Sequence, residues 1–510
     1  MNKTTLWLAA ALALLSATPA SAQKSQDRIR LAFLEAIQFI DPYVDGAAST
    51  SFLAHGVFDN LLAYDEDKHE YAPSLAKSIK RIDDLTVEFE LQDNVKWHDG
   101  AAFDADDVAY TIGWVTDPKT KLRRKADWGS IARVEKLGPH KIRVVTKQPT
   151  PDLLEVLAYR TWIYPEHIFA PLEDKESFGT KPVGTGMVKA IQVDRNAGAI
   201  LLKNPDYKHG NAAKPASNIG RFEVMSIPDE GTQMAHFLRG DLHLIRNTPL
   251  EQAEELIKDP KYKMTLVQSL GFLYMMFDVA GRSGLKPVQD PRVRRAMMMA
   301  INREEVYRLR SGKHPLPRGV NEALCWPYQE GCAYSKPLPA YDPAGAKKLL
   351  AEAGYADGFD IQMTTLPSTK DMAEAVVGQL RTVGIRASVD AQSTVAYNKK
   401  RSEGRLNALV SGTGAGGPGI VRTLNLFFNP GPLDYFQDPE LHALAHKALT
   451  TMDETQRKNA VRELLDTSTE LGYVYPVAPI PIIFLHTSDV VITHHAYDNY
   501  GIRLADVNWR

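Results

Sequence analysis

The sequence predicts a mixed α/β protein, and three observations carry that prediction. Segments 28–33, 85–91 and 141–146 alternate polar and apolar residues, as half-buried strands do. Several apolar-periodic segments open with an Asp that can cap the first turn of a helix. The later half of the chain places a helix-like segment between two strand-like ones, which favours a βαβ unit with a parallel strand pair.

The three alternating segments come first in the chain, and we expect them at the edges of separate small sheets. A helix is predicted over 103–115, because Asp104 can cap it. Asp107 stands three residues further on, where it completes a capping-box-like pair near the positive end of the helix dipole.

Two later helices are predicted from an Asp that caps the helix and a Pro in its first turn. They begin at Asp290–Pro291 and Asp342–Pro343, and they run to Ala300 and Gly354. The βαβ unit follows, as a strand over 360–365, a helix over 371–384 and a strand over 385–390.

The first 22 residues have the pattern of a secretory signal peptide. Lys3 precedes an apolar run over 6–15, and Ala20-Ser21-Ala22 supplies the small-x-small pattern that a signal peptidase cuts. A bilayer-spanning helix needs about 20 apolar residues, and this run is only about half as long. We therefore expect export to the periplasm, with a cleaved membrane anchor as the alternative.

Composition and charge exclude several classes of protein. Hydrophobic residues make up 44% and charged residues 24% of the chain, which excludes collagen-like and wholly disordered proteins. Lys and Arg number 60 against 62 Asp and Glu, so we expect no nucleic-acid partner. Cys325 and Cys332 are the two cysteines, and in an oxidising compartment they predict a local disulfide. A redox or metal pair is the weaker alternative, because the Cys-x-x-Cys form is missing.

Several motifs invite a catalytic or metal interpretation, and structural roles explain them better. Trp97-His98-Asp99-Gly100 ends in a turn dipeptide, and Pro165-Glu166-His167 fits the start of a helix. Gly184-Thr185-Gly186 fits a tight backbone corner, and His494-His495 a solvated pair. The glycine-rich stretch 411–419 lacks the Gly-Lys-Ser/Thr ending of a phosphate loop. We therefore predict no catalytic residue, no metal ligand and no cofactor.

Four blocks of sequence stand in a characteristic order. They are 75–100 followed by 104–108, 182–186 with 203–207, 290–296 with 300–303, and 341–354. Together they resemble the extracellular solute-binding proteins of family 5, which serve ABC transporters for dipeptides, oligopeptides and nickel complexes. The resemblance covers nearly the whole chain after the signal peptide.

This resemblance implies a two-lobed periplasmic-binding-protein fold of the cluster C type, joined by two hinge strands near 270–277 and 474–479. The ligand would close between the lobes. The expected boundaries are 1–22 for the signal peptide, 23–55 with 184–270 and 476–510 for lobe I, 56–183 for an extra subdomain of lobe I, and 271–475 for lobe II.

The glycine-rich stretch departs from the pattern of the family's peptide binders. These carry Trp and then Asp-Pro in a loop of the second lobe, where the Asp pairs with the free amino group of the peptide. Here Thr413 stands where the Trp is expected, and no Asp or Glu occurs from Asn407 to Asn429. An ammonium group without this carboxylate loses about 1.5–3 kcal/mol, which disfavours ordinary peptides with a free amino terminus.

The resemblance also supplies candidate ligand contacts. Arg160 lies where nickel-complex relatives hold a carboxylate with an arginine, and an ordinary ion pair is the alternative. Arg422 follows the glycine-rich stretch, and Trp128 and Trp162 are candidate apolar walls with core packing as the alternative. The remaining candidates contact the ligand through the glycine-rich loop, and they are Thr413, Gly414 and Gly416.

We therefore predict a periplasmic substrate-binding protein of an ABC importer. It would work as a monomer, capture a peptide-like or other small polar organic ligand by hinge closure, and deliver it to an inner-membrane permease. An opine, a sugar conjugate or a metal chelate is the alternative ligand. A secreted hydrolase and a chemoreceptor-coupled or chaperone-like role are the alternatives from other classes.

Overall fold

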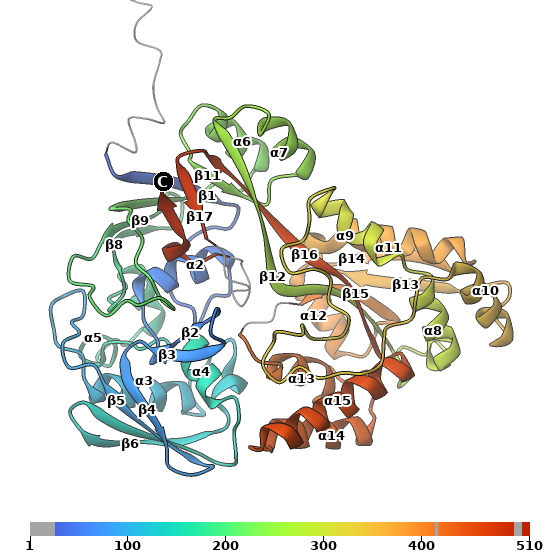
Figure 1. Ribbon diagram of the computed structural model, residues 1–510, viewed down its shortest axis with the longest axis horizontal. Helices are drawn as coiled ribbons and strands as arrows, with labels where there is room; N and C mark the ends of the chain where they lie inside the picture. The colour runs from blue at the N-terminus through green and yellow to red at the C-terminus, as the bar shows by residue number, and fades with distance from the viewer. Residues whose placement is uncertain (1–25, 414–416, 494–501) are drawn as a thin grey trace, which may run out of the picture.

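A computed structural model describes residues 26–413, 417–493 and 502–510 of the chain (Figure 1). Two long strands, β12 (Tyr262–Phe277) and β16 (Val474–Thr487), run side by side through its middle, and separate groups of helices and strands lie at their two ends. The predicted mixed α/β fold with two lobes and two connecting strands is confirmed. The predicted signal peptide, 1–22, lies outside the described residues.

One ten-stranded sheet extends through both lobes, in the order β14-β13-β15-β12-β16-β11-β1-β10-β9-β8. Its other strands are β1 (Arg28–Phe33), β8 (Val188–Asp194), β9 (Gly198–Lys203), β10 (Arg221–Ser226), β11 (Leu244–Arg246), β13 (Asp360–Thr365), β14 (Arg386–Ala391) and β15 (Ala408–Thr413). The antiparallel pairing of β12 with β16 shifts register between Gln268 and Phe272, near the point where the chain passes between the lobes. The exact lobe boundaries stay a prediction.

The expectation that the first alternating segments are sheet edges is wrong. β1 lies inside the ten-stranded sheet, between β10 and β11 and parallel to both. Its polar positions are satisfied there by a neighbouring strand, because the Arg30 Nε lies 2.7 Å from the Glu223 carboxylate of β10. The other two segments are adjacent inner strands of one four-stranded sheet, in the order β4-β5-β7-β6. Its strands are β4 (Ala76–Arg81), β5 (Thr86–Leu91), β6 (Ile131–Gly138) and β7 (Lys141–Thr146).

Lobe I and its extra subdomain share one continuous hydrophobic core, which includes Leu31 of β1, Phe89 of β5 and Phe222 of β10. The subdomain adds a small hairpin of β2 (Leu62–Asp65) and β3 (Glu70–Pro73). The lobe's helices are α2 (Ala48–Val57), α3 (Ala105–Thr116), α4 (Leu153–Tyr159), α5 (Glu166–Phe169), α6 (Glu230–Leu238) and α7 (Leu250–Leu256), with the 3₁₀ turns η1 (Lys125–Trp128) and η2 (Lys175–Thr180). A short pair, β17 (Val490–Ile492) and β18 (Val507–Trp509), and the 3₁₀ turn η5 (Leu504–Asp506) complete it.

Lobe II contains the predicted βαβ unit, because β13 and β14 are parallel and α11 (Lys370–Thr382) connects them. Alternate residues of β12 face two separate cores, as the strand period of two requires. Leu273 and Met275 enter one core, and Tyr274 and Met276 enter the other. The remaining helices of the lobe are α8 (Pro291–Met299), α9 (Arg303–Ser311), α10 (Pro343–Glu352), α12 (Thr394–Ser402), α13 (Val421–Phe428), α14 (Pro439–Thr450) and α15 (Glu454–Leu471), with the 3₁₀ turns η3 (Pro287–Gln289) and η4 (Pro367–Thr369).

The three capped helices form where the sequence predicts them. Asp104 accepts the Asp106 N–H at 2.7 Å, and the Asp107 carboxylate accepts the Asp104 N–H at 3.1 Å, which completes the capping box of α3. The Asp290 side chain accepts the Arg292 N–H and caps α8, and the Asp342 side chain accepts the Gly345 N–H and caps α10. In the part of the chain that the structure describes, each helix is too short or too polar to cross a bilayer.

Candidate functional site

The two lobes contact each other at several points beside the long strands. Arg318 of lobe II forms an ion pair with Glu66 of the subdomain, at 3.1 Å. The Tyr71 hydroxyl of β3 donates to the Glu330 carboxylate of lobe II, also at 3.1 Å. Buried Trp326 packs in one cluster with Tyr64 of β2 and Leu270 of β12. The structure is therefore that of a molecule whose lobes are closed on one another.

Four arginines gather at this junction. Arg123 and Arg124 lie in the turn before η1, and Arg160 caps the C-terminal end of α4. Arg422 comes from the first turn of α13 in lobe II. Burial and, after it, the positive charges of Arg160, Arg422 and Arg123 together lower the pKa of Arg124 to about 9. The predicted pair Arg160 and Arg422 thus belongs to one basic cluster, which we call the arginine cluster.

Each member of this cluster is placed by ordinary local structure. The Arg123 N–H donates to the Tyr43 carbonyl at 3.2 Å, which fixes the turn. The Asp127 carboxylate in η1 lies 3.6 Å from the Arg160 Nε. Its negative charge also raises the pKa of Arg124, against the effect of burial. The Arg124 Nη1 is buried and has no hydrogen-bond partner among the described residues. A buried donor of this kind is suited to an anionic oxygen atom.

Both predicted tryptophans are buried, Trp128 in η1 and Trp162 two residues after Arg160. The Trp128 Nε1 donates to the Thr161 hydroxyl at 3.0 Å. The Trp162 ring meets the His55 ring edge-on, with the centroids 4.7 Å apart. Both side chains have the packing contacts of core residues, so their contact with a ligand stays a prediction.

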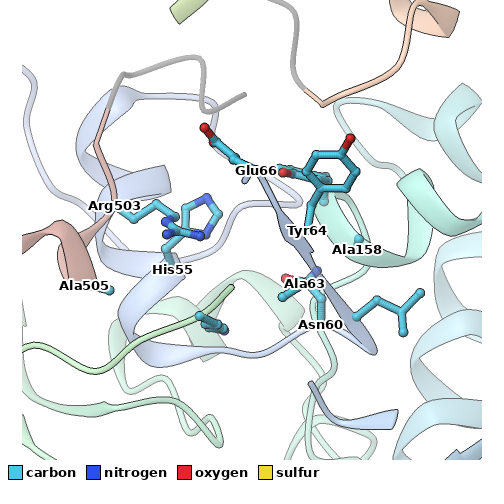
Figure 2. Close-up of a pocket in the computed structure, with 11 residues that line it drawn as sticks. His55, Asn60, Ala63, Tyr64, Glu66, Ala158, Arg503 and Ala505 are labelled. Carbon is cyan, nitrogen blue, oxygen red and sulfur yellow. The ribbon is translucent and has the colours of Figure 1, made fainter. Parts of the chain in front are cut away.

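A pocket lies at the C-terminal end of α4, where Ala158 and Tyr159 line it (Figure 2). It is lined by His55, Asn60, Leu62, Ala63, Tyr64, Glu66, Ala158, Tyr159, Lys214, Arg503 and Ala505. The buried Asn60 Nδ2 has no hydrogen-bond partner in the described ranges. The Lys214 ammonium donates to the Phe58 carbonyl at 2.9 Å and pairs with buried Asp59. The pocket therefore combines amide and cationic donors with the aromatic walls of Tyr64 and Tyr159.

The glycine-rich stretch lies at the edge of the junction. Thr413 ends β15 and pairs in register with Phe272 of β12. Gly414 and Gly416 lie outside the described residues, so their predicted contacts are not placed. The described part, 417–420, is held by the loop that the disulfide closes.

That loop runs from Cys325 to Cys332, which the structure joins with a Cα–Cα distance of 5.8 Å. The Gln329 side-chain amide donates to the Gly419 carbonyl at 2.7 Å. The Glu330 N–H donates to the Pro418 carbonyl at 2.9 Å. The disulfide-bonded loop thus supports the glycine segment 417–420.

An acidic side chain from the opposite lobe meets this segment. Glu155 of α4 is only 6% exposed, and its Oε2 accepts the Gly419 N–H at 3.1 Å. The sequence contains no acid within 407–429, and the acid that meets this segment instead belongs to lobe I, so the sequence analysis did not predict it. Arg124 was also missed, because it lies in the basic run 119–125, which is typical of a solvated surface. For Glu155, the only signal was an acid on the buried face of a short helix.

The motifs interpreted as structural have structural contacts. The His98 Nε2 lies 2.9 Å from the Gly186 carbonyl, and burial lowers the pKa of His98 to about 4. A Cβ on Gly184 would lie 1.9 Å from the Val57 carbonyl oxygen, so the corner requires glycine. His494 and His495 lie outside the described residues. Within the described ranges, no group of three or more His, Cys, Asp or Glu side chains could hold a metal ion.

Comparisons with known proteins agree with this architecture. The dipeptide-binding protein of Pseudoalteromonas sp. SM9913, solved with Met-Leu, matches with a TM-score of 0.79 at 21% identity, over 95% of this chain and 100% of that chain. NikA of Brucella suis, solved with Fe(III)-EDTA, matches with a TM-score of 0.81 at 22% identity, over 95% and 100%. These likenesses confirm the two-lobed fold.

Curated relatives include the glutathione-binding protein GsiB of Salmonella paratyphi A, which is 29% identical over 398 residues, 76% of this chain and 73% of the relative. GsiB of Escherichia coli O157:H7 is 28% identical over 363 residues, 69% of this chain and 67% of the relative. The model of the bacterial extracellular solute-binding proteins, family 5 (middle), matches residues 70–434. The chain therefore belongs to the family 5 extracellular solute-binding proteins and is a solute-binding component of an ABC importer.

Proposed function

We propose that this protein captures a small peptide or peptide-like molecule that carries carboxylate groups and hands it, chemically unchanged, to a permease in the inner membrane. It would act in the periplasm as a monomer. The arginine cluster carries this proposal, because it brings guanidinium groups from both lobes to one place. A ligand carboxylate bound there would contact lobe I and lobe II at once and so favour closure.

The electrostatics support an anionic ligand group. Four guanidinium groups at one junction repel each other, and the lowered pKa of Arg124 reports that repulsion as well as burial. A carboxylate matches the planar fork of a guanidinium and forms charge-assisted hydrogen bonds. Each such bond contributes about 1.5–3 kcal/mol, which is about tenfold to a hundredfold in affinity.

The amino group of the ligand has a different environment. The acid nearest the glycine segment, Glu155, already accepts the Gly419 N–H. Burial and the neighbouring charge of Asp152 raise the pKa of Glu155 to about 8, so this carboxyl is neutral at pH 7. It therefore offers no negative charge for an ammonium group. This favours ligands whose affinity comes from their carboxylates, such as N-blocked peptides, peptide conjugates or opine-like molecules.

The relatives support a peptide-like ligand with more than one carboxylate. Glutathione, which the curated relatives are named for binding, is a tripeptide with two carboxylates. An opine, agropinic acid, occupies a related fold solved from A. tumefaciens R10, at 20% identity. We treat the opine class as the second candidate, because the arginine cluster suits its carboxylate equally well.

A thermal-shift panel on ligand-stripped protein tests the proposal. It holds reduced and oxidised glutathione, Met-Leu, N-acetyl-Met-Leu, Met-Leu amide and opines. A ligand at 100 times its dissociation constant adds about 2.7 kcal/mol to the free energy of unfolding. We expect at least one carboxylate-bearing compound to stabilise the protein and the amide to fail.

Arg124→Gln should remove most of this stabilisation. Arg386→Gln is the matched control, because Arg386 is exposed on β14 and pairs with Asp360. Binding of the amide equal to that of the acid, or equal losses in both variants, would contradict the proposal.

A further inference from the structure

The contact between Glu155 and the glycine segment joins the two lobes through a buried carboxyl group. Glu155 belongs to α4 of the lobe I subdomain, and Gly419 precedes α13 of lobe II. The Glu155 Oε2 accepts the Gly419 N–H at 3.1 Å. Because the partners belong to different lobes, this hydrogen bond exists only while the lobes are closed.

The shape of the segment is fitted to that carboxyl group. A Cβ on Gly419 would lie 2.3 Å from the Glu155 Oε2, and a Cβ on Gly417 would lie 2.0 Å from the Oε1. Gly417 also has φ of +155°, which only glycine adopts readily. The two glycines thus leave room for one side chain of the opposite lobe. This accounts for glycines that neither a phosphate site nor a simple turn explains.

The charged and titratable groups around Glu155 come from both lobes. In lobe I, Asp152 raises the pKa of Glu155 and Arg160 lowers it. The charge of Glu155 in turn raises the pKa of Tyr71 and of Tyr159. From lobe II, Glu330 raises the pKa of Glu155. Arg457 of α15 lies 3.8 Å from the Glu330 carboxylate, and its positive charge lowers the pKa of Asp152. The negative charge of Asp127 raises the pKa of Asp152.

We propose that Glu155 is a positioning residue that couples closure of the lobes to the uptake of a proton. In the open molecule its carboxyl group would be solvated and ionised at neutral pH. In the closed molecule the same group lies buried against the glycine segment, between the carboxyls of Asp152 and Glu330. Closure therefore removes an ionised carboxyl from water unless it takes up a proton. The proton adds to a Glu155 oxygen, and no other bond changes.

The direction of the pH dependence follows. The pKa of Glu155 is raised to about 8 in the closed structure, mainly by burial and then by Asp152. A solvated Glu titrates near about 4.3. Between these two pH values the closed form binds one proton more than the open form, so the ratio of closed to open molecules rises as pH falls. With one proton of difference, this ratio changes by at most about tenfold per pH unit.

The test measures closure without a ligand, so its outcome is separate from that of the ligand panel. Ile191 of β8 and Val395 of α12 are 55% and 80% exposed and lie in different lobes. The variant Ile191→Cys with Val395→Cys carries a spin label at each position, because the two native cysteines are joined to each other. Pulsed electron paramagnetic resonance then gives the fraction of closed molecules at pH 5.5 and pH 8.5.

Four changes are compared in this labelled background. We expect the closed fraction of the parent to be larger at pH 5.5 than at pH 8.5, and Glu155→Gln to show the same closed fraction at both pH values. Gly419→Ala should lower the closed fraction at both pH values, because its Cβ would lie 2.3 Å from the Glu155 Oε2 and the buried carboxyl must move away. Adding Glu155→Ala to Gly419→Ala should restore closure. Gly378→Ala is the control, because that exposed helical glycine has no atom near its added Cβ.

Three results would overturn the inference. The first is a pH shift of equal size in the parent and in Glu155→Gln, which would place the titration elsewhere. The second is a closed fraction in Gly419→Ala equal to that of Gly378→Ala, and the third is no recovery in the double variant. Each would show that the Glu155 contact does not control closure.

Discussion

Two glycine corners of this molecule look alike in the sequence and differ in what they touch. Gly184 and Gly186 pack on the backbone of 56–57, inside lobe I. Gly417 and Gly419 pack on the side chain of Glu155, which belongs to the other lobe. The corner at Gly184 and Gly186 stays packed when the lobes open, because the segments that meet there belong to one hydrophobic core. The second corner separates whenever the lobes open, so its glycines affect the conformational state of the protein more than its stability.

The largest expected effect is at the corner inside lobe I. Gly184→Ala places a Cβ 1.9 Å from the Val57 carbonyl oxygen, and the backbone must shift to accept it. We expect a loss of about 2–3 kcal/mol in the free energy of unfolding, measured by urea denaturation. Gly419→Ala should change this free energy by less than about 1 kcal/mol, because opening of the lobes relieves its clash. Equal losses in the two variants would remove the distinction between the corners.

The next effect concerns the support of the second corner. Cys325→Ser with Cys332→Ser opens a loop whose ends are seven residues apart, and the chain-entropy cost of this is about 2 kcal/mol. Because Gln329 and Glu330 of this loop hold 418–419, we also expect a smaller closed fraction in the spin-label measurement. Lower stability with an unchanged closed fraction would show that the glycine segment keeps its shape without the disulfide.

A smaller effect comes from the charge of Glu155. The native protein holds a proton on this group up to about pH 8, whereas the unfolded chain releases it near about pH 4.3. The native state therefore binds more protons in this range, and the free energy of unfolding falls as pH rises. We expect Glu155→Gln to be more stable than the parent at both pH values and to gain more at pH 8.5 than at pH 5, by calorimetry; opening of the lobes, which lets the parent's carboxyl ionise in water, limits the gain. A gain that is the same at both pH values would contradict the assignment.

The smallest effect is that of a glycine with free space around it. Gly113 lies on the exposed face of α3, and its added Cβ would meet no atom within 4 Å. Gly113→Ala should raise the free energy of unfolding by about 0.5–1 kcal/mol, because Ala loses less backbone entropy in a helix. Destabilisation measured in the same urea series would show that space alone does not explain the two corners.

The sequence predicted features whose cause is local. Asp104 with Asp107, and Asp290 with Pro291, act on their own first helical turn, and both helices form as expected. The disulfide pairing was also readable, since both cysteines lie in one short loop. The position of β1 inside the sheet could not be predicted from the sequence. Its arginines pair with Glu223, which is far away in the sequence and lies on the adjacent strand of the sheet.

The candidate site was predicted only in part, because its residues come from segments that are far apart in the sequence. Arg160 and Arg422 were found through family resemblance, and the structure brings them together with Arg123 and Arg124. Glu155 was missed because the search for an acid stayed within one lobe, and only the fold shows which helix faces the glycine segment. Contacts across the junction depend on the packing of two lobes, which no local pattern in the sequence encodes.

A calorimetric double-mutant cycle tests the claim that the arginine cluster holds a carboxylate of the ligand. The compound with the largest thermal shift and its carboxamide are titrated into the parent protein and into Arg124→Gln. We predict that amidation weakens binding to the parent at least tenfold and binding to Arg124→Gln by much less, because the partner of the carboxylate is already gone. An equal loss in both proteins, or no loss in the parent, would contradict the claim.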